Sequence, residues 1–270
     1  MIIQVTLAFL MVAPVQGQDP TVPKQIKDAF SKVASGASKL KKELSTVGFH
    51  PGICLFGGEL RQGGSIYYSI KVNDPSDYGV IVGVSGKESN IEVSVKDANG
   101  KDVVTGADAS GADFSTSQGG TYTISAKNNG GQTFVALGIV RNEGGSDHPF
   151  SSINTAAASY AASIEDAYKY AWGIPTGDLM VVGNLLGAGG SYSRNSKINY
   201  PKWLILAVAD AGTKSFSLSV TDKTANKTVD GVVEKLYSYS EFDAATQHAS
   251  IVVKNTSQKT ILSLSGHLRQ

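Results

Sequence analysis

The sequence predicts a mainly β protein formed by tandem duplication, with an N-terminal helix followed by an antiparallel β-sandwich in each copy. Short stretches of alternating apolar and polar residues, separated by turn-forming residues, indicate the strands, and 30 of the 270 residues are glycine. Two further stretches carry apolar residues at helical spacing. Short motifs also recur in the same order about 126 residues apart, which indicates the duplication.

The chain begins with a largely apolar segment, residues 2–12, that is typical of an export signal. This segment has the length of a signal-peptide core and is too short to span a bilayer. Small residues Val15 and Gly17 precede a polar stretch, so we predict that residues 1–17 are removed and that the mature chain begins at Gln18. No Lys or Arg precedes the apolar run, which leaves a buried N-terminal strand as the alternative.

Export predicts a periplasmic or extracellular location. No later segment is long and apolar enough to cross a membrane, so we expect no transmembrane segment in the mature chain. Cys54 is the only cysteine, which excludes an intramolecular disulfide, and its apolar neighbours indicate a buried residue rather than a reactive thiol. Export without disulfides favours a bacterial envelope over a eukaryotic secretory route. The glycosylation acceptor motifs at Asn226 and Asn255 would matter only in the eukaryotic route.

The two copies are expected at residues 18–144 and 145–270, with the glycine-rich polar stretch 142–147 as the linker. Single matches between the copies mean little because Gly and Ser are common, but the shared order and nearly constant offset favour a duplication. The matching pairs are Gly63-Gly64-Ser65 with Gly189-Gly190-Ser191, Ser94-Val95-Lys96-Asp97 with Ser219-Val220-Thr221-Asp222, and Lys127-Asn128 with Lys254-Asn255.

Each copy is predicted to open with an amphipathic helix, because its apolar residues are three and four positions apart. The apolar stripe of the first helix consists of Ile26, Phe30, Val33, Ala37, Leu40 and Leu44. The stripe of the second consists of Ile153, Ala157, Tyr160, Ile164, Ala167 and Ala171. Gly48 and Gly173 are the expected stops. Large residues in one stripe often correspond to small ones in the other, so the helices either pack against each other or each pack on its own sandwich.

After each helix, apolar and polar residues alternate as expected for strands with one buried face. In the first copy we predict strands at residues 66–72, 80–85, 91–97, 121–127 and 134–141. In the second copy we predict them at residues 179–186, 203–209, 216–221, 250–254 and 261–268. Frequent turn signals between short strands favour a sandwich or barrel over a parallel doubly wound sheet.

Three segments of the first copy resemble, in order, the opening, central and closing strands of the bacterial pre-peptidase C-terminal (PPC) domain. They are Tyr67-Tyr68-Ser69-Ile70-Lys71-Val72, Ile91-Glu92-Val93-Ser94-Val95-Lys96-Asp97 and Gly120-Thr121-Tyr122-Thr123-Ile124. The resemblance covers residues 65–129. The second copy departs from it, because Gln247-His248-Ala249-Ser250-Ile251 replaces the Gly-Thr-Tyr strand, and no peptidase domain is present. The resemblance implies a non-catalytic β-sandwich attached to secreted proteins.

Charge and motif content argue against several functions. The chain carries 24 basic and 23 acidic residues, spread over both copies, so neither copy has the positive surface that nucleic acid requires. No nucleophile elbow, phosphate loop or metal-ligand spacing occurs, including at the four histidines His50, His148, His248 and His267. We therefore expect no cofactor, no catalytic residue and no enzyme activity. The alternative is a hydrolase with a site at the interface between the copies, where His148 or His248 would meet a carboxylate and a serine.

Asp97, Asn99 and Asp102 surround a glycine with the spacing of some calcium ligands and form the one weak metal-site candidate. Lys101 lies inside this loop, however, and the corresponding loop of the second copy, residues 222–226, lacks the glycine and the second carboxylate. The Asn-Gly pair is a strong hairpin signal. A plain hairpin without a metal is therefore favoured.

Aromatic residues gather in the second copy, where seven of the 11 tyrosines and both tryptophans follow residue 155. Exposed rings could bind sugars or a partner protein, whereas buried ones would simply cover the core. The candidate ligand-binding residues are Tyr168, Tyr170, Trp172, Tyr237 and Tyr239.

These observations favour a non-catalytic exported protein that acts as a binding or structural module of the cell envelope or the extracellular space. The expected partner is an envelope protein or a polysaccharide, and not a nucleic acid.

Overall fold

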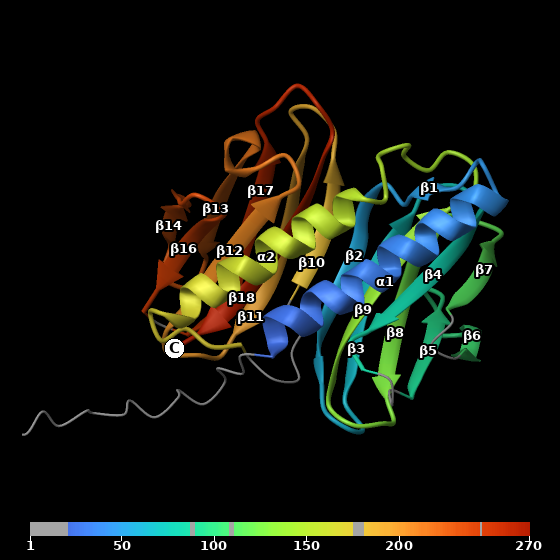
Figure 1. The fold of residues 1–270 in the computed structure, drawn as a ribbon, viewed down its shortest axis with the longest axis horizontal. Helices are drawn as coiled ribbons and strands as arrows, with labels where there is room; N and C mark the ends of the chain where they lie inside the picture. Colours follow the sequence, from blue (N-terminus) through green and yellow to red (C-terminus); the bar gives the residue numbers. More distant parts are fainter. Residues whose placement is uncertain (1–20, 87–89, 108–110, 175–180, 244) are drawn as a thin grey trace, which may run out of the picture.

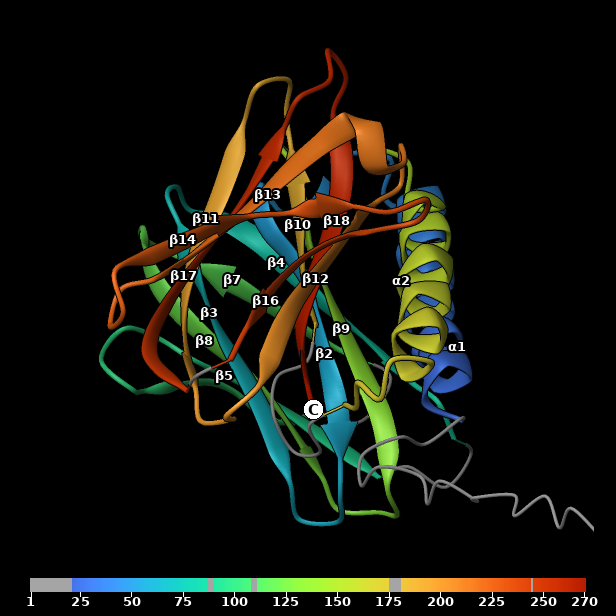
Figure 2. The ribbon, with the colours of Figure 1, turned by 90° about the vertical axis from the view of Figure 1, so that its left-hand side faces the viewer.

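The computed structural model describes residues 21–86, 90–107, 111–174, 181–243 and 245–270. Two helices lie side by side on one face of a large antiparallel sheet, and two four-stranded sheets lie behind its other face (Figures 1 and 2). The chain is therefore mainly β with antiparallel pairing, as predicted. The predicted leader, residues 1–17, and the first two residues of the strand predicted at 179–186 lie outside the described residues.

The described part of the first half begins with a helix that nine strands follow. These elements are α1 (Val22–Glu43), β1 (Gly48–Phe49), β2 (Gly52–Leu60), β3 (Ser65–Val72), β4 (Ser76–Val84), β5 (Ile91–Lys96), β6 (Asp102–Ala107), β7 (Ala112–Thr116), β8 (Gly120–Asn128) and β9 (Thr133–Arg141). The sequence located β3, β4, β5, β8 and β9, and it missed the other four strands. Strand β2 was missed because both of its faces are buried, so its residues do not alternate.

The second half has a similar succession of elements. They are α2 (Ser152–Tyr168), β10 (Val181–Leu186), β11 (Ser191–Ile198), β12 (Trp203–Ala209), the short 3-10 helix η1 (Thr213–Ser215), β13 (Phe216–Asp222), β14 (Lys227–Asp230), β15 (Val232–Val233), β16 (Ser238–Phe242), β17 (Thr246–Asn255) and β18 (Ile261–Arg269). Strands β11, β14, β15 and β16 were not among the predicted strands.

One continuous sheet runs through both halves in the order β15-β16-β12-β18-β10-β2-β9-β4-β7, with β1 paired to β9. At its centre, β2 and β10 pair antiparallel, so main-chain hydrogen bonds join the halves. Counted outward from this joint, β2-β9-β4-β7 and β10-β18-β12-β16 occupy corresponding places. The smaller sheets also correspond, with the orders β3-β8-β5-β6 and β11-β17-β13-β14.

Helices α1 and α2 pack against each other and also against strands of their own halves, so both arrangements left open by the sequence occur together. The predicted stripes are buried at most positions. Two positions of the predicted stripes are wrong. Leu44 lies beyond the end of α1 and is 47% exposed, and α2 ends at Tyr168, which leaves Ala171 in left-handed backbone outside the helix. No helix within the described ranges is long and apolar enough to cross a membrane.

Three apolar clusters form the core. The first lies between the helices and the large sheet and includes Phe30, Tyr160 and Cys54. Cys54 is fully buried, as expected from its neighbours, and burial raises the pKa of its thiol far above the usual value. The other two clusters fill the two sandwiches, the second one around Trp203, whose ring stacks on Phe242 at 4.3 Å.

The predicted linker, residues 142–147, is not a free connection. Phe49 and Ser146 exchange backbone hydrogen bonds of 3.1 and 2.9 Å, which attach the segment to the edge of β1. Immediately after it, Nε2 of His148 lies 2.7 Å from Oδ2 of Asp210 in the second half. The segment is therefore held against the first half, and the residue that follows it is anchored within the second half.

Two fully buried asparagines hold the turns that follow β2 and β10. Nδ2 of Asn128 lies within 3.3 Å of three carbonyl oxygens, those of Leu60, Arg61 and Gly131. Nδ2 of Asn255 makes the equivalent contacts, at 2.9 Å or less, with the carbonyls of Leu186, Gly187 and Lys259. The recurring Lys-Asn motif thus has the same structural role in both halves.

We expect Asn128→Ala and Asn255→Ala each to lower the free energy of unfolding by about 1–3 kcal/mol, because each leaves buried carbonyls unpaired. Asn129→Ala is the matched control, since this side chain is exposed and bonds only weakly to Glu92 at 3.3 Å, and it should change stability by less than about 0.5 kcal/mol. Urea titration measures the three variants. Equal, small effects at all three positions would show that the asparagines do not hold the turns.

Candidate functional site

A recess of about 350 Å³ opens at the C-terminal end of α2, beside β12 and β16 of the large sheet. We call it the aromatic pocket. Its aromatic lining consists of Tyr170, Trp172, Tyr237 and Tyr239. Its polar lining consists of Asp166, Lys202, Glu234, Glu241 and Gln270. Residues from the end of α2 and from β16, about 70 positions further along the chain, therefore form one site.

A hydrogen bond fixes one wall of the aromatic pocket. The hydroxyl of Tyr237 donates to Oδ2 of Asp166 at 2.9 Å, and Nζ of Lys169 donates to Oδ1 of the same carboxylate at 2.8 Å. The bond from Lys169, followed by the bond from Tyr237, holds the pKa of Asp166 below its usual value. Burial and the bond to Asp166 raise the pKa of Tyr237, so this hydroxyl stays protonated as a donor.

Trp172 and Tyr170 present their rings differently. Trp172 is 6% exposed, and Nζ of Lys202 lies 5.4 Å from the centre of its ring while pairing with Glu241 at 3.1 Å. Tyr170 is 64% exposed, and its carbonyl accepts a hydrogen bond of 3.1 Å from Gln270. The pocket thus combines a fixed indole with a tyrosine ring that is open to solvent.

Four of the five aromatic residues that the sequence singled out line this pocket. The fifth, Tyr168, is half-buried and packs against the core between the helices and the large sheet. The sequence did not point to the polar members. Glu241 reaches the pocket because β16 pairs with β12 in a register that places Glu241 opposite Leu204. No local sequence pattern predicts that register.

The corresponding end of α1 has a pocket of different chemistry. Its volume is about 590 Å³, and apolar side chains, including Leu40, Leu44, Val103 and Phe114, line much of it. The aromatic and charged combination described above is therefore a property of the second half.

Asp97, Asn99 and Asp102 form a hairpin turn. Oδ1 of Asp97 accepts hydrogen bonds of 2.9 Å from the backbone N–H groups of Asn99 and Lys101. Asp102 instead pairs with Lys96 at 3.4 Å. The two carboxylates therefore have separate partners, and within the described residues no group of three or more His, Cys, Asp or Glu side chains could hold a metal.

His148 does lie near a carboxylate and a serine, but the contacts differ from those of a hydrolase. Ser152 bonds to Asp210, the same residue that His148 contacts. Although burial opposes it, the bonds from His148, from the backbone N–H of Leu262 and from Ser152 lower the pKa of Asp210. A nucleophilic serine needs the imidazole as its base. This cluster instead joins the start of α2 to the end of β12, while His248 lies exposed on β17.

No protein-family model and no curated protein matches the chain. Among solved structures, the 7S globulin of Momordica charantia is 12% identical, with 78% of this chain and 71% of that chain covered and a TM-score of 0.21. The tandem CBM22 domains of Paenibacillus barcinonensis Xyn10C are 10% identical, with 78% and 92% covered and a TM-score of 0.21. Similarities at this level assign neither a family nor a function.

Proposed function

We propose that this protein is a non-catalytic exported binding module that holds a neutral saccharide in the aromatic pocket. The observation that carries the proposal is the convergence of four aromatic side chains with a few charged ones around a single recess. Aromatic rings supply apolar faces on which sugar rings can lie, and the polar side chains orient the hydroxyl groups. The volume of about 350 Å³ falls within the usual range of ligand sites.

The charges around the aromatic pocket favour a neutral ligand. Glu241 pairs with Lys202, so the ammonium group is already compensated. Glu234 adds a further carboxylate to the lining, and no other cation among the described lining residues offsets it. An anionic ligand would therefore meet net repulsion.

We also infer a tandem duplication with copies at residues 18–144 and 145–270. The matching strand orders, the antiparallel joint between β2 and β10 and the equivalent contacts of Asn128 and Asn255 support it. Export and the resemblance to the PPC domain are proposed on the sequence alone: the apolar leader supports a periplasmic or extracellular location. A polysaccharide of the envelope is the corresponding partner.

Tyr170→Ala tests the proposed function. Because the exposed Tyr170 ring should stack on the ligand, we expect its removal to weaken binding of a neutral oligosaccharide roughly 5–30-fold. Calorimetric titration with cellohexaose, xylohexaose and mannohexaose measures the affinity. Leu44→Ala is the control: Leu44 is 47% exposed and lies outside the aromatic pocket. Equal losses in both variants, or no binding of any of the three sugars, would refute the proposal.

A further inference from the structure

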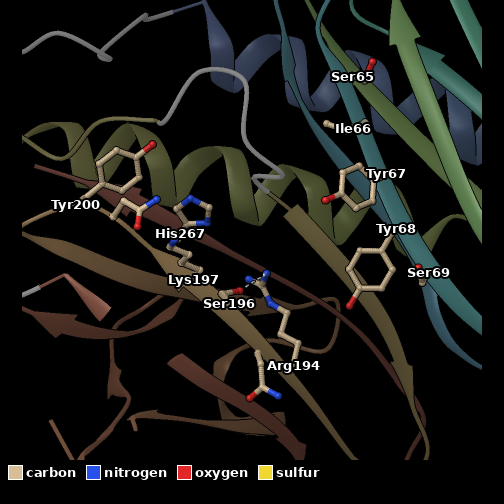
Figure 3. A pocket seen from close by; sticks show the side chains of 12 residues that line it. Ser65, Ile66, Tyr67, Tyr68, Ser69, Arg194, Ser196, Lys197, Tyr200 and His267 are labelled. Atoms are coloured by element: carbon tan, nitrogen blue, oxygen red, sulfur yellow. Dashed lines mark hydrogen bonds between the residues drawn. The ribbon is translucent and has the colours of Figure 1, made fainter. Parts of the chain in front are cut away.

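A second cleft lies between the two smaller sheets, where the edge strands β3 and β11 face each other (Figure 3). We call this space of about 630 Å³ the inter-sheet cleft. Tyr67 and Tyr68 line it from β3, and Arg194 and Lys197 line it from β11. The hydroxyls of Tyr68 and Tyr192 lie 2.6 Å apart and connect the two edges. The cleft is thus built by both halves of the chain.

Arg194 is the unusual residue of the inter-sheet cleft. Its side chain is 8% exposed, and its Nε and Nη2 atoms are buried without a hydrogen-bond partner among the described residues. Its Nη1 atom donates to Ser196 at 3.4 Å, which is a long bond. None of the residues that line the cleft is acidic, and Arg194 takes part in none of the ion pairs formed by the described residues. A buried guanidinium without a counterion is strongly unfavourable.

The inner face of the second sandwich is also more polar than that of the first, and one of its polar residues, His267, lines the inter-sheet cleft. The face of β9 that points into the first sandwich carries Val135, Leu137 and Ile139. The registers of the β2–β9 and β10–β18 pairs show which positions of β18 correspond. These positions carry Ser263, Ser265 and His267. Oγ of Ser265 and both amide atoms of the fully buried Asn184 on β10 have no partner among the described residues.

The same comparison applies to Arg194 itself. It lies opposite Ile251 in the β11–β17 pair, and Tyr68 lies opposite Ile124 in the β3–β8 pair, so the two residues occupy corresponding positions. The second half thus carries a cation where the first carries a phenol. An unpaired guanidinium in the wall of a cleft is costly for a free protein, and it indicates a ligand that bonds to it.

The lining defines the chemistry of that ligand. A guanidinium matches the two oxygens of a carboxylate, and Lys197 adds a second positive charge. Hydroxyl and amide side chains of Ser65, Ser196, Asn195 and Asn199 suit a hydroxylated body. The exposed ring of Tyr67 offers a flat apolar face.

We propose that the inter-sheet cleft binds an acidic saccharide whose carboxylate pairs with Arg194. The inter-sheet cleft shares no residue with the aromatic pocket, so this proposal can be tested independently of the neutral-saccharide proposal.

The test compares D-glucuronate and D-galacturonate with D-glucose and inorganic sulfate in NMR titrations of the full chain. We expect at least one uronate to shift the signals of Tyr67 and Arg194, with glucose and sulfate binding at least about tenfold more weakly. Arg194→Met should weaken uronate binding about thirtyfold or more, because it removes one partner of a buried charge pair. Arg194→Lys, which keeps the charge and loses the planar fork, should be intermediate.

A second measurement separates a ligand anchor from a structural residue. Arg194→Met should raise the melting temperature of the free protein, because it removes a buried unpaired charge. Arg61→Met makes the same change at an exposed arginine in the turn after β2 and should alter neither binding nor stability. Uronate binding that survives Arg194→Met, sulfate or glucose binding as tight as uronate binding, absence of uronate binding, or destabilisation of the free protein by Arg194→Met would each overturn the proposal.

Discussion

Replacing Phe30 with alanine should destabilise the whole molecule in one cooperative transition. Phe30 is fully buried in the cluster that both helices share with the large sheet, and its ring lies 6.0 Å from that of Phe134. Truncating such a phenylalanine costs about 3–5 kcal/mol, which corresponds to a fall in melting temperature of roughly 6–20 °C for a chain of this size. Because β2 and β10 pair at the centre of one sheet, neither half can lose this cluster alone.

Differential scanning calorimetry measures this effect. Leu44→Ala is the control, since Leu44 is 47% exposed beyond the end of α1 and its truncation should shift the transition only slightly. Two separate transitions, of which Phe30→Ala lowers only one, would mean that the halves are independent modules.

Replacing Gly83 with alanine should also have a large effect, because α1 approaches β4 most closely there. A Cβ atom on Gly83 would overlap the carbonyl oxygen of Ala29 on α1 and crowd Val33. Gly138 on β9 also lies close against α1, since a Cβ there would overlap the side chain of Val33. The helix would have to move away from the sheet, which we expect to cost about 3 kcal/mol.

Gly131→Ala provides the control for the alanine at Gly83. A Cβ at Gly131 would meet no atom within 4 Å, so the same change should alter the free energy of unfolding by less than about 0.5 kcal/mol. Chemical denaturation of the two variants compares them. If Gly83→Ala were as harmless as Gly131→Ala, α1 would not be held against the sheet in the way described.

Helical and alternating patterns predicted much of the fold correctly, since they arise from burial on one side of an element. Most of the stripe that includes Phe30 is buried, and strands with one buried face such as β5 were found, although the short strands β7 and β16 were missed. Strand β2 was missed because burial on both faces removes the alternation. The continuous sheet could not be predicted either, since the pairing of β2 with β10 joins segments far apart in the chain and depends on their combined hydrogen bonds.

Part of the aromatic pocket could be predicted from the sequence, whereas the key residue of the inter-sheet cleft could not. Aromatic enrichment pointed to Tyr170, Trp172 and Tyr237, because the residue types themselves carry the signal. Arg194 gave no such signal. It lies in a polar strand with an unremarkable local sequence, and only its burial without a counterion distinguishes it. Burial of that kind is set by the packing of two sheets, which no local pattern records.

Tryptophan fluorescence can show whether the aromatic pocket binds a neutral saccharide. The chain has two tryptophans, Trp172 in the pocket and Trp203 in the core. In Trp203→Phe the remaining signal reports on the pocket, and in Trp172→Phe it reports on the core. We expect cellohexaose, xylohexaose or mannohexaose to change the emission of the Trp203→Phe variant in a saturable manner and to leave that of Trp172→Phe unchanged. Saccharide binding detected by calorimetry without any change in the emission of Trp172 would contradict this expectation.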